Sequence, residues 1–89
     1  MQSRKLPAFD KALAKLNDET RSRAAKAYRL WSENPNHPSL HFKRVSTGQD
    51  VWSVRIDINC RALGLRKNDT IYWFWIGDHA EYDRLLRSL

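Results

Sequence analysis

The sequence lacks the features that would cross-link a small protein, anchor it in a membrane or direct its export. It contains a single cysteine, Cys60, so no disulfide can form within the chain, and a lone thiol suits a reducing compartment. No stretch is long and apolar enough to span a bilayer. The start, MQSRKLPAF, lacks the apolar run of a secretory signal. We therefore expect a cytoplasmic protein without membrane association.

Several kinds of reactive centre are also missing. With only three glycines, the chain has no glycine-rich phosphate loop. The three histidines, His37, His41 and His79, share no metal-ligand spacing, and one cysteine cannot complete a zinc knuckle. No serine is accompanied by an evident base and orienting partner. We expect neither a metal nor a cofactor.

Acidic residues are outnumbered. Sixteen lysines and arginines face ten aspartates and glutamates, which gives a net charge of +6 on 89 residues. Such an excess on a small surface attracts polyanions, and nucleic acid is the first candidate. Attraction to an acidic protein partner and plain solubility are the alternatives. The charge alone names no particular nucleic acid.

Aromatic side chains, by contrast, are plentiful. Four tryptophans, three tyrosines and three phenylalanines can bury a large area from few positions, which a chain of 89 residues requires. There are no repeats, low-complexity tracts or long linkers. Residues 1–89 are therefore expected to form a single domain.

The first third of the chain predicts two helices. In residues 7–18 apolar side chains recur at helical spacing, and Pro7 suits a first turn, where its missing N–H costs nothing. Asn17 and Asp18 interrupt this pattern and can cap a second helix, and residues 19–34 repeat the helical spacing. Pro35 ends this helix, because proline disfavours helical geometry in the residue before it. The result is a helical hairpin with an apolar seam.

The remainder of the chain predicts a sheet and a final helix. Strands are expected at residues 40–45, 51–58, 60–65 and 70–76, with a turn at 46–50 and a short helix at 79–89. The last strand is apolar on both faces, so we expect it to lie centrally with both faces covered. We therefore predict an α+β fold in which the helical hairpin packs on a four-stranded antiparallel β-meander.

The strand at 51–58 alternates between apolar and polar residues. Its apolar positions, Trp52, Val54, Ile56 and Ile58, are expected to face the core. Ser53, Arg55 and Asp57 then share the opposite, polar face of the sheet.

Basic side chains from neighbouring strands can converge on that polar face. Arg55 stands on it, Arg61 opens the next strand, and Lys43 and Arg44 come from the first strand. Guanidinium groups grip phosphate well, because their forked donors match its oxygens and stay charged. His79 and Tyr82 enter where the last strand ends, and histidine is the usual proton carrier near neutral pH.

Each of these residues has a plainer interpretation that stays open. Arg55 could be a solvated strand residue, and Arg61 could pair with Asp57 or Asp69. His79 could cap the final helix, and Tyr82 could be a core residue. Trp73 and Trp75 are more readily explained as core than as base-stacking platforms. The residues alone indicate a basic α+β domain that binds an anionic polymer.

Three segments, taken in order, resemble a known family. In their order and type, three stretches resemble the corresponding segments of the RelE/ParE superfamily of bacterial toxins: HPSLHFKRV, WSVRIDINCRALGL and TIYWFWIGDHAEYDRLL. The closing H-x-E-Y-D pattern resembles HigB-like members. This resemblance extends over roughly residues 8 to 86 and rests on the order and spacing of the segments.

The resemblance implies a toxin of a type II toxin–antitoxin system that acts as a ribosome-dependent, metal-independent mRNA endoribonuclease. Arg55 and Arg61 would stabilise the phosphorane, His79 would act as general acid or base, and Tyr82 would position the substrate or assist proton transfer. The implied RNA-binding residues are Lys43, Arg44, Arg55 and Lys67. The implied partners are a cognate antitoxin, the ribosome and mRNA.

The chain also departs from the family pattern. Many relatives open with a β-strand, whereas only MQSRKL precedes the first helix here, so either the sheet lacks that edge strand or the start of the sequence is truncated. Cys60 replaces a common tyrosine, and Ser53 stands where RelE carries lysine, which lowers the charge of the implied site. Two alternatives therefore stay open: a ParE-like, non-catalytic DNA gyrase inhibitor, and a degenerate inactive toxin.

Overall fold

The structure, a computed structural model of the chain, describes residues 1–46 and 48–89. Its elements are β1 (Gln2–Lys5), α1 (Pro7–Ala14), α2 (Asp18–Glu33), the 3₁₀ helix η1 (Pro38–Leu40), β2 (Lys43–Ser46), β3 (Val51–Asp57), β4 (Cys60–Lys67), β5 (Thr70–Asp78) and α3 (His79–Arg87). Thr47, in the turn predicted at 46–50, lies outside the described residues. Among the described helices, none has both the length and the apolarity needed to cross a membrane.

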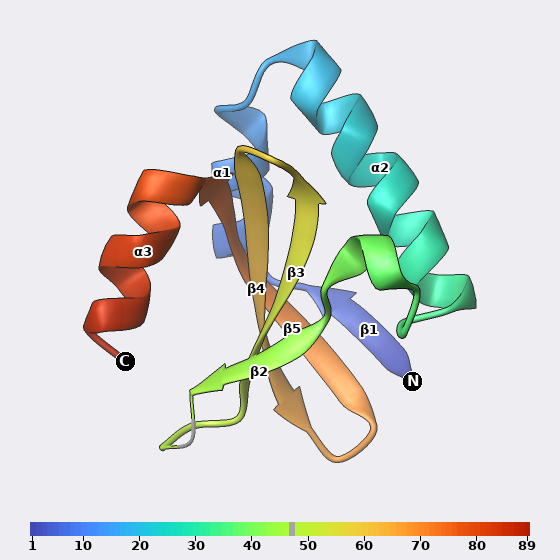
Figure 1. The fold of residues 1–89 in the computed structure, drawn as a ribbon, viewed down its shortest axis with the longest axis vertical. Helices are drawn as coiled ribbons and strands as arrows, with labels where there is room; N and C mark the ends of the chain where they lie inside the picture. The colour runs from blue at the N-terminus through green and yellow to red at the C-terminus, as the bar shows by residue number, and fades with distance from the viewer. Residues whose placement is uncertain (47) are drawn as a thin grey trace.

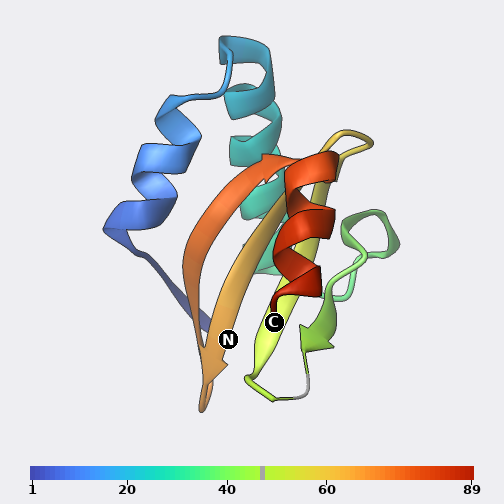
Figure 2. The ribbon, with the colours of Figure 1, turned by 90° about the vertical axis from the view of Figure 1, so that its left-hand side faces the viewer.

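The strands form one sheet in the order β1-β5-β4-β3-β2, with helices on both faces. Figure 1 shows α2 on one side of the sheet and α3 on the other, and Figure 2 shows α3 in front of the sheet with α2 behind it. The predicted α+β fold, with a helical hairpin on an antiparallel meander and a short final helix, is confirmed. The hairpin face of the sheet is the one that α1 and α2 cover, and the α3 face is the other.

The predicted strand count was wrong, because the sheet has five strands. Residues Gln2–Lys5 form β1, which pairs with the start of β5 in parallel orientation (Figure 1). This segment is short and mostly exposed, so it has no apolar alternation that a sequence pattern could reveal. Its order comes from backbone hydrogen bonds to β5, which only the assembled sheet provides.

The helical hairpin forms where the sequence predicts it. The Asn17 side chain caps α2 by accepting a hydrogen bond from the Thr20 backbone N–H at 2.8 Å. Trp31 of α2 meets Trp73 of β5 edge-to-face, with ring centroids 5.4 Å apart. These two rings lie in the main core, whose buried members are Phe9, Ala24, Ala27, Trp31, Leu40, Val54, Cys60, Ala62, Ile71, Trp73 and Ile76.

A smaller core lies on the α3 face. Its buried members are Val51, Leu63 and Tyr82, and Leu85 and Leu86 of α3 pack against them. A register shift between Leu63 and Gly64 of β4 lets β5 send Trp73 into the main core and Trp75 toward α3. The prediction that this strand is covered on both faces is therefore confirmed.

Two details of the β3 prediction were wrong. A register shift between Arg55 and Asp57 turns Asp57 toward α2, where its carboxylate pairs with Arg23 at 3.2 Å. Asp57 therefore does not share the face of Ser53 and Arg55. Ile58, predicted to face the core, follows this shift and is 71% exposed.

Candidate functional site

Two arginines stand side by side on the α3 face of the sheet. Arg55 of β3 and Arg61 of β4 are directly opposite each other in the antiparallel register. They follow Ser53 and Leu63, the preceding opposed pair on that face. Like charges directly opposite each other repel, so the pair is stabilised when an anion binds between them. Both side chains are only partly exposed, which limits screening by water.

Arg61 is held by the backbone of the β3–β4 turn. Its Nη1 donates to the carbonyl oxygens of Asp57 at 2.5 Å and Cys60 at 3.1 Å. Within residues 1–46 and 48–89 it forms no salt bridge to a carboxylate, so the predicted pairing with Asp57 or Asp69 is absent. These bonds orient the guanidinium without neutralising its charge.

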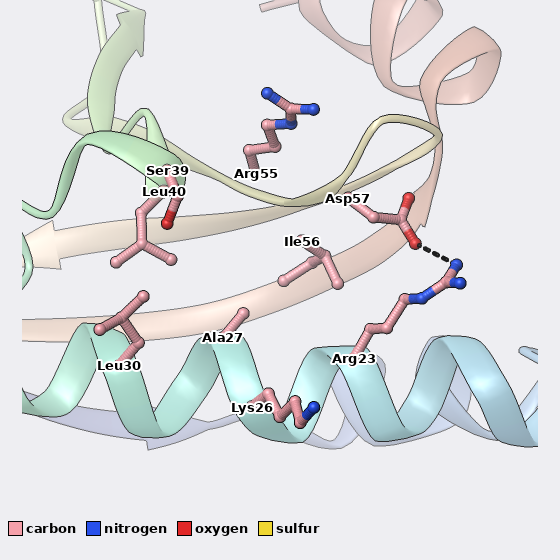
Figure 3. A pocket seen from close by; sticks show the side chains of 9 residues that line it. All are labelled: Arg23, Lys26, Ala27, Leu30, Ser39, Leu40, Arg55, Ile56 and Asp57. Atoms are coloured by element: carbon pink, nitrogen blue, oxygen red, sulfur yellow. Dashed lines mark hydrogen bonds and ion pairs between the residues drawn. The ribbon is translucent and has the colours of Figure 1, made fainter.

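Arg55 is free of such bonds. It makes no hydrogen bond or ion pair within the described part of the chain. Figure 3 shows its guanidinium on the side of β3 that faces away from α2. A partly buried cation without a partner is costly to keep, and a bound anion would offset that cost.

His79 opens α3 at the same end of the sheet. Its backbone N–H donates to the Asn59 carbonyl oxygen at 2.9 Å, which places the start of α3 beside the β3–β4 turn. The half-exposed imidazole has Nε2 3.7 Å from Asp83 Oδ2. The helix cap predicted for His79 belongs instead to Asp78, whose Oδ1 accepts from the Glu81 N–H at 2.8 Å.

The ring of Tyr82 packs against the imidazole of His79 and holds it in place. It is 5% exposed, and its hydroxyl donates to Ser53 Oγ at 2.9 Å. Its ring stacks on His79 with centroids 5.7 Å apart and on Trp75 with centroids 6.4 Å apart. Tyr82 is therefore a core residue that ties α3 to β3 and orients His79. Sequence reasoning missed the role of Ser53, because a serine on the polar side of a strand is expected to face water.

The other candidate residues lie on different faces and at different ends of the sheet. Lys43 pairs with Ser53, so it shares the α3 face with Arg55. Arg44 pairs with Trp52 on the other face and has Nε 3.3 Å from Asp50 Oδ1. Lys67 lies six residues from Arg61 along β4, a distance of roughly 20 Å at the usual rise per residue. The fold thus brings Lys43, Arg55, Arg61, His79 and Tyr82 to one face, and leaves Arg44 and Lys67 apart.

Cys60 is not a nucleophile in this arrangement. Burial, followed by the nearby Asp57 carboxylate, raises the pKa of its thiol from 9.0 to about 11. The thiol is therefore protonated at neutral pH and packs in the main core. In the described part of the chain, no group of three His, Cys, Asp or Glu residues is arranged to hold a metal ion.

The comparisons with known proteins agree with the fold. The family model of the ParE-like toxin domain matches residues 18–84. The chain therefore belongs to the ParE-like toxin domain family, and its resemblance to the RelE/ParE superfamily is confirmed. No curated protein sequence gives a significant match.

Solved structures show the same architecture at low sequence identity. YafQ from E. coli strain BL21(DE3) superposes with a TM-score of 0.72 at 9% identity, covering 91% of this chain and 96% of YafQ. The RelB–RelE antitoxin–toxin complex of Methanococcus jannaschii gives 0.71 at 17%, covering 90% and 95%. The archaeal RelE–RelB complex of Pyrococcus horikoshii OT3 gives 0.66 at 16%, covering 86% and 92%.

Proposed function

We propose that this protein is the toxin of a toxin–antitoxin pair and cleaves mRNA on the ribosome, with the α3 face as its active site. The observation that carries the proposal is the cross-strand pair of Arg55 and Arg61 beside an exposed His79. Two guanidiniums can hold one phosphodiester through charge-assisted hydrogen bonds. A half-exposed imidazole nearby can exchange protons with the RNA.

In the proposed reaction, the RNA supplies its own nucleophile. The 2′-hydroxyl loses its proton and attacks the adjacent phosphorus, the bond to the 5′-oxygen breaks, and that oxygen takes up a proton. The products are a 2′,3′-cyclic phosphate and a 5′-hydroxyl. Arg55 and Arg61 stabilise the charge that develops on the phosphorane, and His79 exchanges a proton with one of the two oxygens. Tyr82 holds the His79 ring by stacking.

An antitoxin is the expected protein partner. Two similar structures, those from M. jannaschii and P. horikoshii, are complexes of RelE with RelB. The net charge of +6 favours an acidic partner, which would cover the arginine pair and bind at a rate that falls with added salt.

The test is cleavage of message in a translating extract, mapped by primer extension. Arg55→Ala is the cleanest variant, because Arg55 has no partner in the described structure whose loss would disturb the fold. We expect its cleavage rate to fall by about 10²–10³-fold, as for loss of one transition-state donor. The control is Arg66→Ala, on the same strand as Arg61 but facing Trp52 on the hairpin face. Cleavage that survives in folded Arg55→Ala overturns the assignment.

Gyrase inhibition is the second candidate. The observation in its favour is Ser53, which is buried against Tyr82 and adds no charge to the face, at a position where the resemblance implies a lysine in RelE. A supercoiling assay with purified gyrase separates the two functions. Inhibition by wild-type protein, retained in Arg55→Ala and accompanied by intact message, would replace the ribonuclease proposal.

A further inference from the structure

The outer edge of β5 is paired with a strand over only part of its length. β1 pairs with residues 70–73 of β5, and the chain then leaves the sheet to form α1. Among the described residues, no strand pairs with the rest of β5 on that side. Figure 2 shows α1 beside this edge and α3 in front of the sheet. Residues 74–78 of β5 thus line a groove of about 460 Å³ between α1 and the start of α3.

This groove adjoins the arginine pair. Gly77 lines the groove and is the register partner of Arg61, so the two residues lie about 5 Å apart and face the same side of the sheet. A Cβ at Gly77 would lie 2.5 Å from Cζ2 of Trp75. The Trp75 ring therefore covers Gly77 on the α3 face, and a larger residue would not fit there. A phosphodiester held between Arg55 and Arg61 would have Trp75 beside it.

Aromatic rings and lysines meet in the groove. Phe74 and Trp75 both line it and are only partly buried. Lys11 and Lys15 stand one helical turn apart on α1, so they lie on the same face of the helix. Both lysines are exposed, and neither makes a hydrogen bond or ion pair in the part of the chain that the structure describes. This combination suits single-stranded nucleic acid, because bases stack on the rings while phosphates pair with the cations.

Carboxylates lie at the α3 end of the groove. Asp78 Oδ1 is engaged in capping α3, whereas the exposed Glu81 carboxylate has no partner among the described residues. A carboxylate only accepts hydrogen bonds. It therefore favours adenine, cytosine and guanine, which carry amino groups, over uracil, whose single N–H lies between two carbonyl oxygens. An acidic protein segment would meet Asp78 and Glu81 as like charges, so it is the poorer ligand.

We propose that the groove between α1 and the start of α3 is a nucleotide subsite for single-stranded RNA that selects adenosine, cytidine or guanosine over uridine. The base packs on Phe74 and Trp75, and the Glu81 carboxylate accepts a hydrogen bond from its amino group. Lys11 and Lys15 pair with the next phosphate. The place of this nucleotide in the reaction, beside the phosphodiester held by the arginine pair, rests on the proposed function.

Binding of short RNA in the absence of ribosomes tests the subsite. The probes are fluorescein-labelled pentamers of cytidine and of uridine, two bases of equal ring size, and binding is followed by anisotropy. Both carry 2′-fluoro sugars, which lack the hydroxyl that would attack the phosphate. We expect the wild-type protein to bind the cytidine pentamer about tenfold more tightly, the size of one base-edge contact. Equal affinities for the two pentamers would overturn the proposal.

Glu81→Gln tests the group that selects the base. The glutamine amide both donates and accepts, so the preference for cytidine should fall to about twofold or less. Loss of a negative charge strengthens the binding of both pentamers, so the ratio of the two affinities is the readout. The control is Asp10→Asn, which makes the same charge change at an exposed residue of α1 outside the groove lining. Its ratio should stay at the wild-type value. An unchanged ratio in Glu81→Gln contradicts the selection.

Lys15→Gln tests the phosphate contact. The slope of the logarithm of affinity against the logarithm of salt concentration should become shallower by about 0.7, the value for one contact to a single strand. Arg29→Gln removes the same charge from an exposed residue of α2 outside this groove, so its slope should stay near that of the wild type. Equal changes in the two variants would mean that the RNA is held by the net charge of the protein and not by the groove.

Trp75→Leu tests the stacking surface while keeping an apolar side chain next to Tyr82. Both pentamers should bind about tenfold more weakly, as loss of one base–aromatic contact predicts. Thermal denaturation checks that the variant is folded at the temperature of the assay. Wild-type affinity in folded Trp75→Leu would remove the ring from the subsite.

Mapping of cleavage in the translating extract separates the subsite from the proposed function. If the wild-type protein binds the pentamers as described but cuts no message, the proposed function fails and the subsite stands. If message is cut and Glu81→Gln leaves the base preference beside the cut unchanged, the proposed function stands and the role of the subsite in the reaction is overturned.

Discussion

The two faces of the sheet differ in what they bury. On the hairpin face, tryptophans and aliphatic residues from both helices, η1 and three strands form a cluster of buried residues that extends along the sheet. On the α3 face, Val51, Leu63 and Tyr82 are the buried members of the described cluster, and they adjoin a buried serine. Beyond this small cluster, the same face carries Arg55 and Arg61.

This difference assigns different tasks to the two faces. Apolar burial on the hairpin face supplies most of the stability and holds the backbones of β3, β4 and β5 in place. Those backbones set the spacing of the arginine pair on the other face. The α3 face therefore needs no strong packing of its own to hold the two arginines in place. The charges can therefore remain partly exposed and available to an anion.

The largest expected effect is on the hairpin face. Trp73→Ala removes a ring that is 3% exposed and should lower the free energy of unfolding by about 3–5 kcal/mol, measured by urea denaturation. Trp75→Ala is the matched variant on the α3 face, where the ring is only partly buried, and we expect less than half of that loss. Equal losses would contradict the division of tasks.

The next effect tests the link between α3 and β3. Tyr82→Phe leaves the hydroxyl of Ser53, which is 2% exposed, without its partner. The free energy of unfolding should fall by about 1–3 kcal/mol, the cost of an unsatisfied buried group. The double variant Tyr82→Phe/Ser53→Ala should recover most of the loss. If instead the two changes add, the hydrogen bond does not account for the effect.

The pH dependence of the free energy of unfolding tests whether water is excluded from Cys60 on the hairpin face. Because the pKa of Cys60 rises from 9.0 to about 11 on folding, the folded protein holds this proton more tightly than the unfolded chain. This stabilisation of the folded state is fully present below pH 9 and is lost as the pH rises toward 11. At pH 10 the loss amounts to about 1 kcal/mol. Denaturation of wild type and Cys60→Ala across this window should diverge by that amount, and parallel curves would show a hydrated thiol.

The smallest expected effect concerns the ion pair between α2 and β3. Arg23→Gln removes the contacts to Asp57 and Glu19, and because the Arg23 side chain is half exposed we expect a loss of only about 0.5 kcal/mol. The loss should shrink further in high salt. A loss of stability larger than that of Tyr82→Phe would mean that this ion pair is a main contributor to the packing of α2 on β3.

The sequence predicted the fold better than it predicted the site. Helical spacing and alternation located both hairpin helices, four strands and α3, because each pattern is a local property of the chain. The edge strand β1 escaped, since four mostly exposed residues carry no such pattern. Arg55, Arg61 and Lys43 do share a face, whereas Arg44 is turned to the other face and Lys67 lies at the far end of β4. The catalytic roles of Arg55, Arg61, His79 and Tyr82 stay predictions.

By itself, the sequence determined which segments are helical or extended, and that basic residues would gather on the sheet. Tertiary structure alone decided the parallel pairing of β1, the turn of Asp57 toward α2, and the contact of Tyr82 with Ser53. The physical reason is that periodicity follows from the geometry of a short stretch of backbone. Register shifts and buried polar contacts instead depend on how segments far apart in the chain compete for the same neighbours.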